Sequence, residues 1–346
     1  MDFVSIIKQK ANDYFGEIQA IRQHLHQYPE LSFEEIETAQ FIADKLTEYG
    51  IPFKSGIAGT GIVGTIEGKN PRTNKIALRA DMDALPIIEK NEVAYKSTKD
   101  GIMHACGHDV HSACLLGAAK ILNELRESFE GSIQLIFQPG EEKLPGGASL
   151  MIKEGVLEDK AIKGIVGQHV YPELETGKIG LRSGKYMASA DELHVKVIGK
   201  GGHAALPQHT VDAVLMASTI IVSLQQLVSR NAPPTVPSVL SFGKIEGLGA
   251  TNVLPDVVTL EGTFRTMDEV WREEAHKKMV RLAESIAEGM GGKCEFEVRK
   301  GYPFLTNDAK MTAEAYKAAQ DYVGAENVID LDLRMTAEDF SFYTHL

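Results

Sequence analysis

The first half of the chain alternates short apolar runs with helical patterns. Strands are predicted at four places, residues 61–66, 75–80, 132–138 and 164–169. Between residues 110 and 125, apolar residues recur every three or four positions, which predicts a helix, and residues 1–27 read as an amphipathic helix. Alternating strands and helices are typical of an α/β protein. We therefore expect a central mixed sheet flanked by helices.

From about residue 187 the pattern changes to strand, helix, strand, strand, helix, strand. These elements are predicted at residues 192–200, 211–228, 238–245, 257–265, from 271 onward, and 293–300. The βαββαβ order is ferredoxin-like. In the second helix the apolar spacing is kept until two glycines end it, through Trp271, Ala275, Met279, Leu282, Ile286 and Met290. We expect this stripe to form core.

An α/β pattern returns after Pro303, so the ferredoxin-like domain is predicted to be an insertion. We assign residues 187–301 to the inserted domain and residues 1–186 and 302–346 to the main domain. A length of 346 residues agrees with two domains, since single domains are usually shorter.

Charge and hydropathy narrow the classes of partner. The 36 basic and 48 acidic residues give a net charge of −12, which disfavours nucleic acids and anionic membranes as partners. We find no signal-peptide pattern and no run of about 18 apolar residues, so we expect a cytoplasmic protein without a membrane span. The three cysteines are few, and an odd number cannot all pair, which argues against a disulfide framework. Metal binding or burial remain as their uses.

The segment HACGHDVH, residues 104–111, places His104, Cys106, His108 and His111 between a loop and the predicted helix. Thiolates and imidazoles are good ligands for zinc and similar ions, and a short loop with a glycine can bring two of them to one ion. The segment favours metal binding. A cysteine nucleophile paired with a histidine is the rival interpretation, and a surface loop with a buried cysteine is the plainer one.

Two further polar sites follow predicted strands. Glu141 and Glu142 come just after the strand at 132–138, and His169 ends the strand at 164–169. Ligands gather beyond the carboxyl ends of strands in α/β sheets, so one glutamate could bind metal while its neighbour acts as general base. Alone, a glutamate pair is more often a solvated loop and a lone histidine more often structural. Their occurrence together with Cys106 and His108 outweighs those separate interpretations.

Longer motifs then make a family resemblance specific. The motifs are HLHQYPELSFEE, LRADMDALPI, MHACGHDVH, FQPGEE, GQHVYPEL, GKGGHAALPQHTVDAV, TNVLPDVVTLEGTFRT and MTAEDFSFY. On these segments, spread over nearly the whole length, the chain resembles the di-metal family of aminoacylases, carboxypeptidases and N-acyl-amino-acid amidohydrolases. It is most similar to the branch of hippurate hydrolases and plant hydrolases of indole-acetyl-amino-acid conjugates.

The resemblance implies two divalent ions per subunit, with zinc, manganese, cobalt and nickel left open. It makes Cys106 a thiolate that bridges the ions, with His108 and His169 completing the ligands of one ion and Glu142 binding the other. It makes Glu141 the general base.

The resemblance also assigns residues around the metals and in the inserted domain. His203 resembles the histidine that reaches the partner subunit's site and stabilises the oxyanion, which implies a homodimer formed through the inserted domain. Asn252 and Arg265 resemble residues that hold the substrate carboxylate, a group suited to a guanidinium fork. Asp81 and Asp83 resemble a turn below the metals, where a carboxylate can orient a histidine ligand.

One departure from the family concerns the second ion. The family has a further histidine ligand in a segment that follows the AEDFSFY stretch, whereas this sequence ends at Leu346 and His345 lies too close to that stretch to match. Two expectations follow: either the sequence is incomplete, or fewer protein groups hold the second ion and full activity is in doubt.

The expected reaction is hydrolysis of an amide next to a free carboxylate, as in N-acyl amino acids or small peptides. Three other classes stay open: a cysteine hydrolase that uses Cys106, a metal-depleted binding or regulatory protein, and a dehydrogenase. The last rests on the glycines of GKGGHA at residues 199–204, whose spacing is not GxGxxG.

Overall fold

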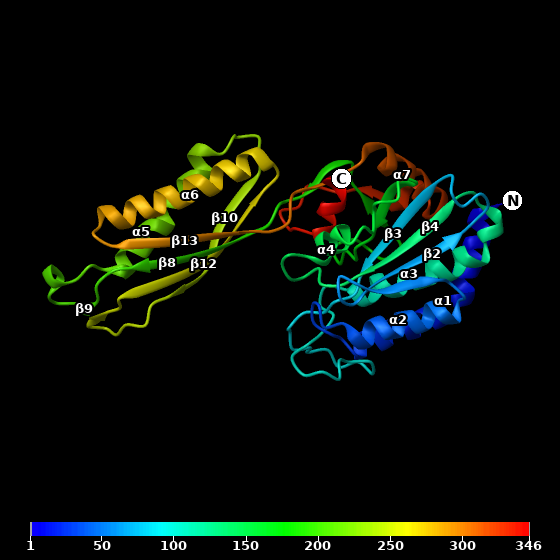
Figure 1. The fold of residues 1–346 in the computed structure, drawn as a ribbon, viewed down its shortest axis with the longest axis horizontal. Helices are drawn as coiled ribbons and strands as arrows, with labels where there is room; N and C mark the ends of the chain where they lie inside the picture. The colour runs from blue at the N-terminus through cyan, green and yellow to red at the C-terminus, as the bar shows by residue number, and fades with distance from the viewer. Residues whose placement is uncertain (1, 346) are drawn as a thin grey trace. The chain divides into compact units, whose positions relative to one another are not determined.

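The computed structural model describes residues 2–345 and divides into two compact units (Figure 1). The first unit takes up the chain as far as Ser183, together with Asp308–Leu331 and the residues from Phe342 onward. The second unit consists of Gly184–Asn307 and Asp332–Ser341. Both ends of the described part of the chain therefore belong to the first unit.

A five-stranded mixed sheet is the centre of the first unit. Its strands are β1 (Phe53–Ile57), β2 (Gly61–Glu67), β3 (Lys75–Asp81), β4 (Ser132–Gln138) and β5 (Ile162–Gly167), in the order β1-β2-β4-β3-β5. Strand β3 pairs in parallel with β4 and β5, whereas β2 pairs antiparallel with β1 and β4. The carboxyl ends of β3, β4 and β5 thus lie at one edge of the sheet. The predicted mixed α/β sheet is confirmed.

Helices cover both faces of this sheet because its central strands are apolar on both sides. In β4, Leu135 and Phe137 are buried against α1 (Phe3–Gln27), α2 (Ile36–Glu48) and α3 (His108–Glu124). Ile136 points to the other face and packs with Met151 of α4 (Gly147–Lys153). The remaining elements of this unit are β6 (Ile179–Leu181), α7 (Ala309–Val323) and β15 (Val328–Asp330), and β6 pairs in parallel with β15.

The second unit contains a separate antiparallel sheet with two helices packed on it. The chain order is β8 (Asp191–Ile198), α5 (Ala213–Gln226), β10 (Ser238–Glu246), β12 (Val257–Thr266), α6 (Glu269–Gly289) and β13 (Lys293–Lys300). The strand order is β10-β12-β8-β13 (Figure 1). Two small pairs complete the unit, β7 (Gly184–Met187) with β14 (Leu305–Asn307) and β9 (Gly202–His203) with β11 (Val253–Leu254).

Some predicted details change. Helix α3 begins at His108, two residues before the predicted start, because Gly107 supplies a positive φ of 92° at the N-cap. The buried stripe of α6 runs through Ala283 and Ala287, while Leu282 and Ile286 are only partly buried beside it. Small residues let this helix lie close to the sheet. A prediction based on the spacing of large apolar residues does not identify such alanines as core.

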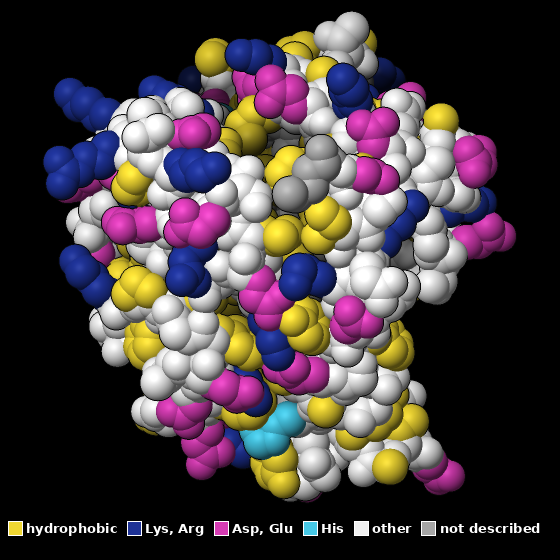
Figure 2. All heavy atoms as spheres, turned by 90° about the vertical axis from the view of Figure 1, so that its right-hand side faces the viewer, with side chains coloured by type: hydrophobic (Ala, Val, Ile, Leu, Met, Phe, Trp, Pro, Cys, Tyr) yellow, Lys and Arg dark blue, Asp and Glu magenta, His cyan; other side chains and the backbone are white. Residues whose placement is uncertain are grey.

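One helical stretch in the described part of the chain, Ala213–Asn231, is long and apolar enough to cross a membrane by length and composition alone. Part of it is core of the second unit, including Met216, Ile220 and Leu224. On the face of the molecule shown in Figure 2, lysine and arginine side chains lie among aspartates and glutamates and form no basic stripe.

Candidate metal centre

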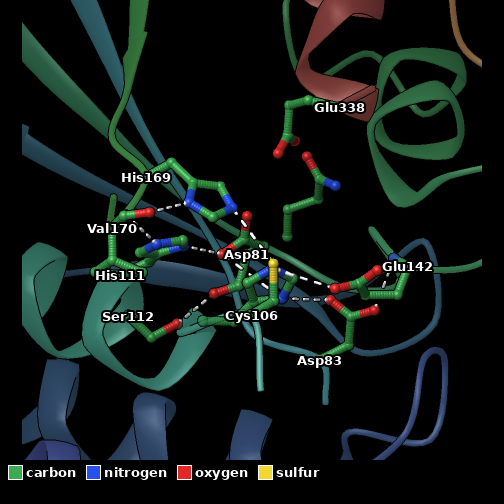
Figure 3. A network of polar contacts seen from close by, with 12 residues as sticks. Asp81, Asp83, Cys106, His111, Ser112, Glu142, His169, Val170 and Glu338 are labelled. Atoms are coloured by element: carbon green, nitrogen blue, oxygen red, sulfur yellow. Dashed lines mark hydrogen bonds and ion pairs between the residues drawn. The ribbon is translucent and has the colours of Figure 1, made fainter. Parts of the chain in front are cut away.

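The carboxyl edge of the first sheet gathers the polar residues that the sequence singled out. Strand β3 ends at Asp81, β4 ends three residues before Glu141, and His169 follows the end of β5. Helix α3 adds His108, its first residue, and Cys106 lies just before this helix, near His169 (Figure 3). Parallel pairing of β3 with both neighbours is what brings these separate segments together.

Cys106, His108 and His169 form a group whose ligand atoms lie within 4.8 Å of one another. The Sγ of Cys106 lies 3.4 Å from Nε2 of His169. The same criterion groups His108 with Glu141 and Glu142. His108 therefore belongs to both groups, which describe one continuous set of sulfur, nitrogen and oxygen donors.

The environment of one buried ring nitrogen, Nε2 of His108, indicates whether a metal ion fits this set of donors. His108 is fully buried, and among residues 2–345 its Nε2 atom has no hydrogen-bond partner. The nearest carboxylate oxygen recorded for this nitrogen is Oε1 of Glu142, 3.8 Å away. A buried polar atom without a partner is costly, and a divalent ion between nitrogen, thiolate and carboxylate donors would satisfy it. The residues fit a metal centre.

Asp83 fixes the orientation of His108 and of the glutamate turn. Its Oδ1 atom lies 3.1 Å from Nδ1 of His108, and its Oδ2 atom accepts hydrogen bonds from Ser32 Oγ at 2.6 Å and from the Glu142 amide at 3.0 Å. The His108 proton is therefore placed on Nδ1, which leaves the Nε2 lone pair for a metal. Burial raises the pKa of Asp83, but these hydrogen bonds and the nearby His108 outweigh burial and lower it.

Asp81 orients a histidine to which the sequence assigned no role of its own. Its Oδ1 lies 2.6 Å from Nδ1 of His111, and Nε2 of His111 accepts a hydrogen bond from the Val170 amide at 2.9 Å. Val170 follows His169, whose Nδ1 lies 2.7 Å from the Val170 carbonyl oxygen. His111 therefore holds the loop that carries His169. The available signal was its spacing, since His111 lies one helical turn after His108.

Close packing also locks the two ligand loops together. A Cβ atom on Gly107 would lie 2.3 Å from Cγ2 of Val170, so a side chain at that position would displace Val170. His104, in contrast, does not join the donor set. It is buried, burial lowers its pKa to about 4, and within residues 2–345 neither ring nitrogen has a hydrogen-bond partner. At neutral pH His104 is uncharged.

The sequence candidates of the second unit lie at two different ends of its sheet. His203 in β9 pairs with Val253, and the Ala204 amide donates to the Asn252 carbonyl at 2.9 Å, so His203 and Asn252 are neighbours. Both lie beyond the end of the sheet where Ile198 pairs with Val257. Arg265 lies eight positions further along β12, about 26 Å from Val257 at the usual rise per residue. Asn252 and Arg265 of one chain therefore cannot hold the same small carboxylate.

A mixed sheet with cysteine, histidine and glutamate donors at its carboxyl edge, joined in one chain to a separate antiparallel sheet, is the architecture of a two-unit metallohydrolase. The chain belongs to the peptidase family M20/M25/M40, whose model matches residues 77–346. The family predicted from the sequence motifs is confirmed.

Individual relatives narrow the comparison. The chain is 43% identical over 323 residues to the N-acetyl-L-cysteine deacetylase of Bacillus subtilis, covering 93% of this chain and 76% of that protein. It is 41% identical over 301 residues to the N-acyl-L-amino acid amidohydrolase of Geobacillus stearothermophilus, covering 87% and 80%. A solved Bacillus subtilis structure, described as a dinuclear metal-binding peptidase of the M20 family, matches with a TM-score of 0.79 and 33% identity, covering 96% and 86%.

Proposed function

We propose that this M20-family amidohydrolase hydrolyses the amide bond of N-acyl amino acids with two divalent ions and Glu141 as general base. The observation that carries the proposal is the buried Nε2 atom of His108, which faces a shared set of thiolate, imidazole and carboxylate donors. The named activities of the deacetylase and amidohydrolase relatives support the substrate class.

The chain would hold the ions with donors from different loops. Cys106, His108 and His169 would hold one ion, and Glu142 would hold the second. The family resemblance would make the Cys106 thiolate a ligand of both ions. When bound, such ions lower the pKa of a coordinated water toward about 7 and polarise the scissile carbonyl. Burial raises the pKa of the Cys106 thiol and His108 opposes that effect. Four donors in one place favour metal binding over a cysteine hydrolase, which needs only a cysteine and one histidine.

Glu141 would be the residue that moves protons. It is buried, and a carboxylate oxygen of Glu141 falls within the 4.8 Å group that contains His108 and Glu142. A buried carboxylate next to metal ligands can accept a proton from the attacking water and return it to the departing amine. Glu142, whose amide donates to Asp83, would serve as a metal ligand instead.

A homodimer would complete the site, because His203 and Asn252 lie at the opposite end of the sheet from Arg265. In a symmetric pair, His203 and Asn252 of one chain could serve the site to which the other chain contributes Arg265. We propose that the ferredoxin-like second unit forms this dimer. In helix α5 the side chains of Leu215 and Val222 are 55% and 73% exposed, and β10 is an edge strand of the sheet. A second copy of the chain could therefore pack on this apolar helix face or pair with this strand edge.

The proposal is tested by separating the two glutamates. Glu141→Gln should keep the metal content of the wild type but lower kcat about 10²-fold or more, since general acid–base catalysis contributes about 10²–10⁴. Glu142→Ala should lower the metal content itself. Metal content is measured by elemental mass spectrometry and hydrolysis on a panel of N-acetyl-L-amino acids. Equal metal loss in both variants, or full activity of Glu141→Gln, would contradict the proposal.

A further inference from the structure

Glu35 is a fully buried carboxylate that the mechanism above does not use. It stands at the N-cap of α2, but its side chain makes no capping hydrogen bond to that helix. Glu30 does this work instead, because its Oε2 accepts from the Thr38 amide at 2.8 Å. The carboxylate of Glu35 is therefore available for contacts outside its own helix.

Donors from three other positions reach the Glu35 carboxylate. Its Oε1 atom accepts from the Phe33 amide at 2.9 Å and from the Gly140 amide at 2.8 Å. Its Oε2 atom accepts from the Thr60 hydroxyl at 2.7 Å. Gly140 directly precedes Glu141, so one hydrogen bond joins the N-terminal segment to the turn that carries the proposed base.

The two turns also interlock sterically. Gly140 has a φ of 57°, and a Cβ atom there would lie 2.4 Å from the ring of Phe33. Phe33 itself has a positive φ of 68°, which is uncommon for a large side chain and marks a backbone held by its surroundings. Ser32, beside Phe33, donates to Asp83, the residue that orients His108 and the Glu142 amide. The same short segment thus contacts both sides of the glutamate pair.

We propose that Glu35 is a positioning residue that fixes the Gly140–Glu142 turn and thereby sets the location of Glu141 relative to the metal ligands. This inference rests on the proposed role of Glu141 as the base. Glu35 acts through the turn and touches neither substrate nor metal. Because the reacting groups must be aligned closely, a displacement of the base by about 1 Å can cost about 10²-fold in rate.

Three substitutions of Glu35 distinguish the effect of its side-chain length from the effect of its charge. Glu35→Gln keeps the oxygen that accepts from Phe33 and Gly140, and its amide can donate to Thr60, so the turn stays in place without the charge. Glu35→Asp keeps the charge but withdraws the oxygens by one methylene. Glu35→Leu removes both acceptor oxygens, and with them all three hydrogen bonds, at similar volume. Glu34→Ala, on the neighbouring exposed residue, is the matched control.

The first readout is hydrogen exchange of the metal-loaded full chain, followed by mass spectrometry on peptides that contain Gly140. Exchange should rise in Glu35→Leu and Glu35→Asp and match the wild type in Glu35→Gln and Glu34→Ala. The second readout is kcat on an N-acetyl-L-amino acid at saturating divalent metal, so that weaker binding through Glu142 does not register. The kcat should fall about 10²-fold in Glu35→Leu, fall clearly in Glu35→Asp, and stay within about threefold in Glu35→Gln.

A role in stability alone would lower the melting temperature of Glu35→Leu and leave kcat of the folded protein unchanged. That result would overturn the inference, as would unchanged exchange at Gly140 or a Glu35→Asp variant with wild-type kcat beside an impaired Glu35→Gln. If Glu35→Leu does not fold, the comparison of Asp with Gln still decides. Should Glu141→Gln prove fully active, the proposed base would be wrong, yet the exchange data would still show whether Glu35 holds the turn.

Discussion

Arg272→Met should destabilise the second unit strongly, because Arg272 joins the two segments that lead into and out of its sheet. The guanidinium is fully buried and contacts both carboxylate oxygens of Asp191, with Nε to Oδ2 at 2.9 Å and a terminal nitrogen to Oδ1 at 2.6 Å. The same terminal nitrogen donates to the carbonyls of Ala190 and Gly301, each at 3.1 Å. Ala190 precedes β8 and Gly301 follows β13.

The size of the expected loss in stability depends on the hydrogen-bond partners that Asp191 would keep in Arg272→Met. Without Arg272 the buried carboxylate retains His276 Nε2 at 2.6 Å and the Gly301 amide at 3.2 Å. Breaking a buried ion pair costs about 3–5 kcal/mol because a charge is left uncompensated. Since two partners remain, we expect about 3 kcal/mol, the lower end. Adding Asp191→Asn should recover part of that loss by removing the stranded charge.

The pH dependence of unfolding gives a second readout of the same pair. Burial raises the pKa of Asp191, but hydrogen bonds from His276 and Arg272 outweigh burial and lower it. A carboxyl whose folded-state pKa is lowered contributes stability above its unfolded-state pKa of about 3.9, and this stability is lost as the pH falls through the folded-state value. In Arg272→Met that contribution should shrink, so stability should depend less on pH below about 4.

The assay is urea unfolding followed by tryptophan fluorescence. Trp271 is the single tryptophan of the sequence and is buried in the core of the second unit, so its emission reports that unit. Arg281→Met, on an exposed position of the same helix, is the matched control and should change stability by less than about 0.5 kcal/mol. A loss below about 1 kcal/mol in Arg272→Met, or strict additivity with Asp191→Asn, would refute the reasoning.

Two further predictions concern the site. His111→Phe should weaken metal binding about 10–100-fold, because the Val170 amide loses its acceptor and His169 is no longer held. A competition titration with a chelating dye measures the affinity, and a wild-type value would contradict this prediction. Mixing His203→Ala chains with Glu141→Gln chains should restore up to about half of the wild-type activity per heterodimer, since one of the two sites keeps both groups. Subunit exchange, shown by mass spectrometry of tagged chains, without any recovered activity would rule out the shared site.

Local patterns predicted the elements that carry the site. Alternation in β4 located Leu135 and Phe137 on one face. Glu141, Glu142 and His169 were found because they follow apolar strands, and Cys106 and His108 because they are clustered in the HACGHDVH segment. The parallel pairing of β3 with its neighbours then brings Cys106, His108 and His169 together, as a site at strand ends requires. Periodicity and element order were sufficient for this part.

Residues that support the site were not predictable in the same way. Glu35 lies 105 positions before Gly140, and His111 meets Val170 across 59 positions, so neither contact leaves a periodic trace in the sequence. In α6, burial of Ala283 and Ala287 depends on how closely the helix approaches the sheet. Only the folded arrangement shows that Asn252 and Arg265 lie too far apart to share a ligand within one chain.

Removal and return of the metal test most directly whether this protein is a metal-dependent amidohydrolase. Hydrolysis of N-acetyl-L-amino acids should stop when a strong chelator strips the purified protein, and should return on addition of zinc, manganese, cobalt or nickel ions. Alkylation of Cys106 should be slower in the metal-loaded protein, because the thiolate is then a ligand. Activity that survives excess chelator but is destroyed by alkylation would contradict the metal mechanism and favour a cysteine hydrolase.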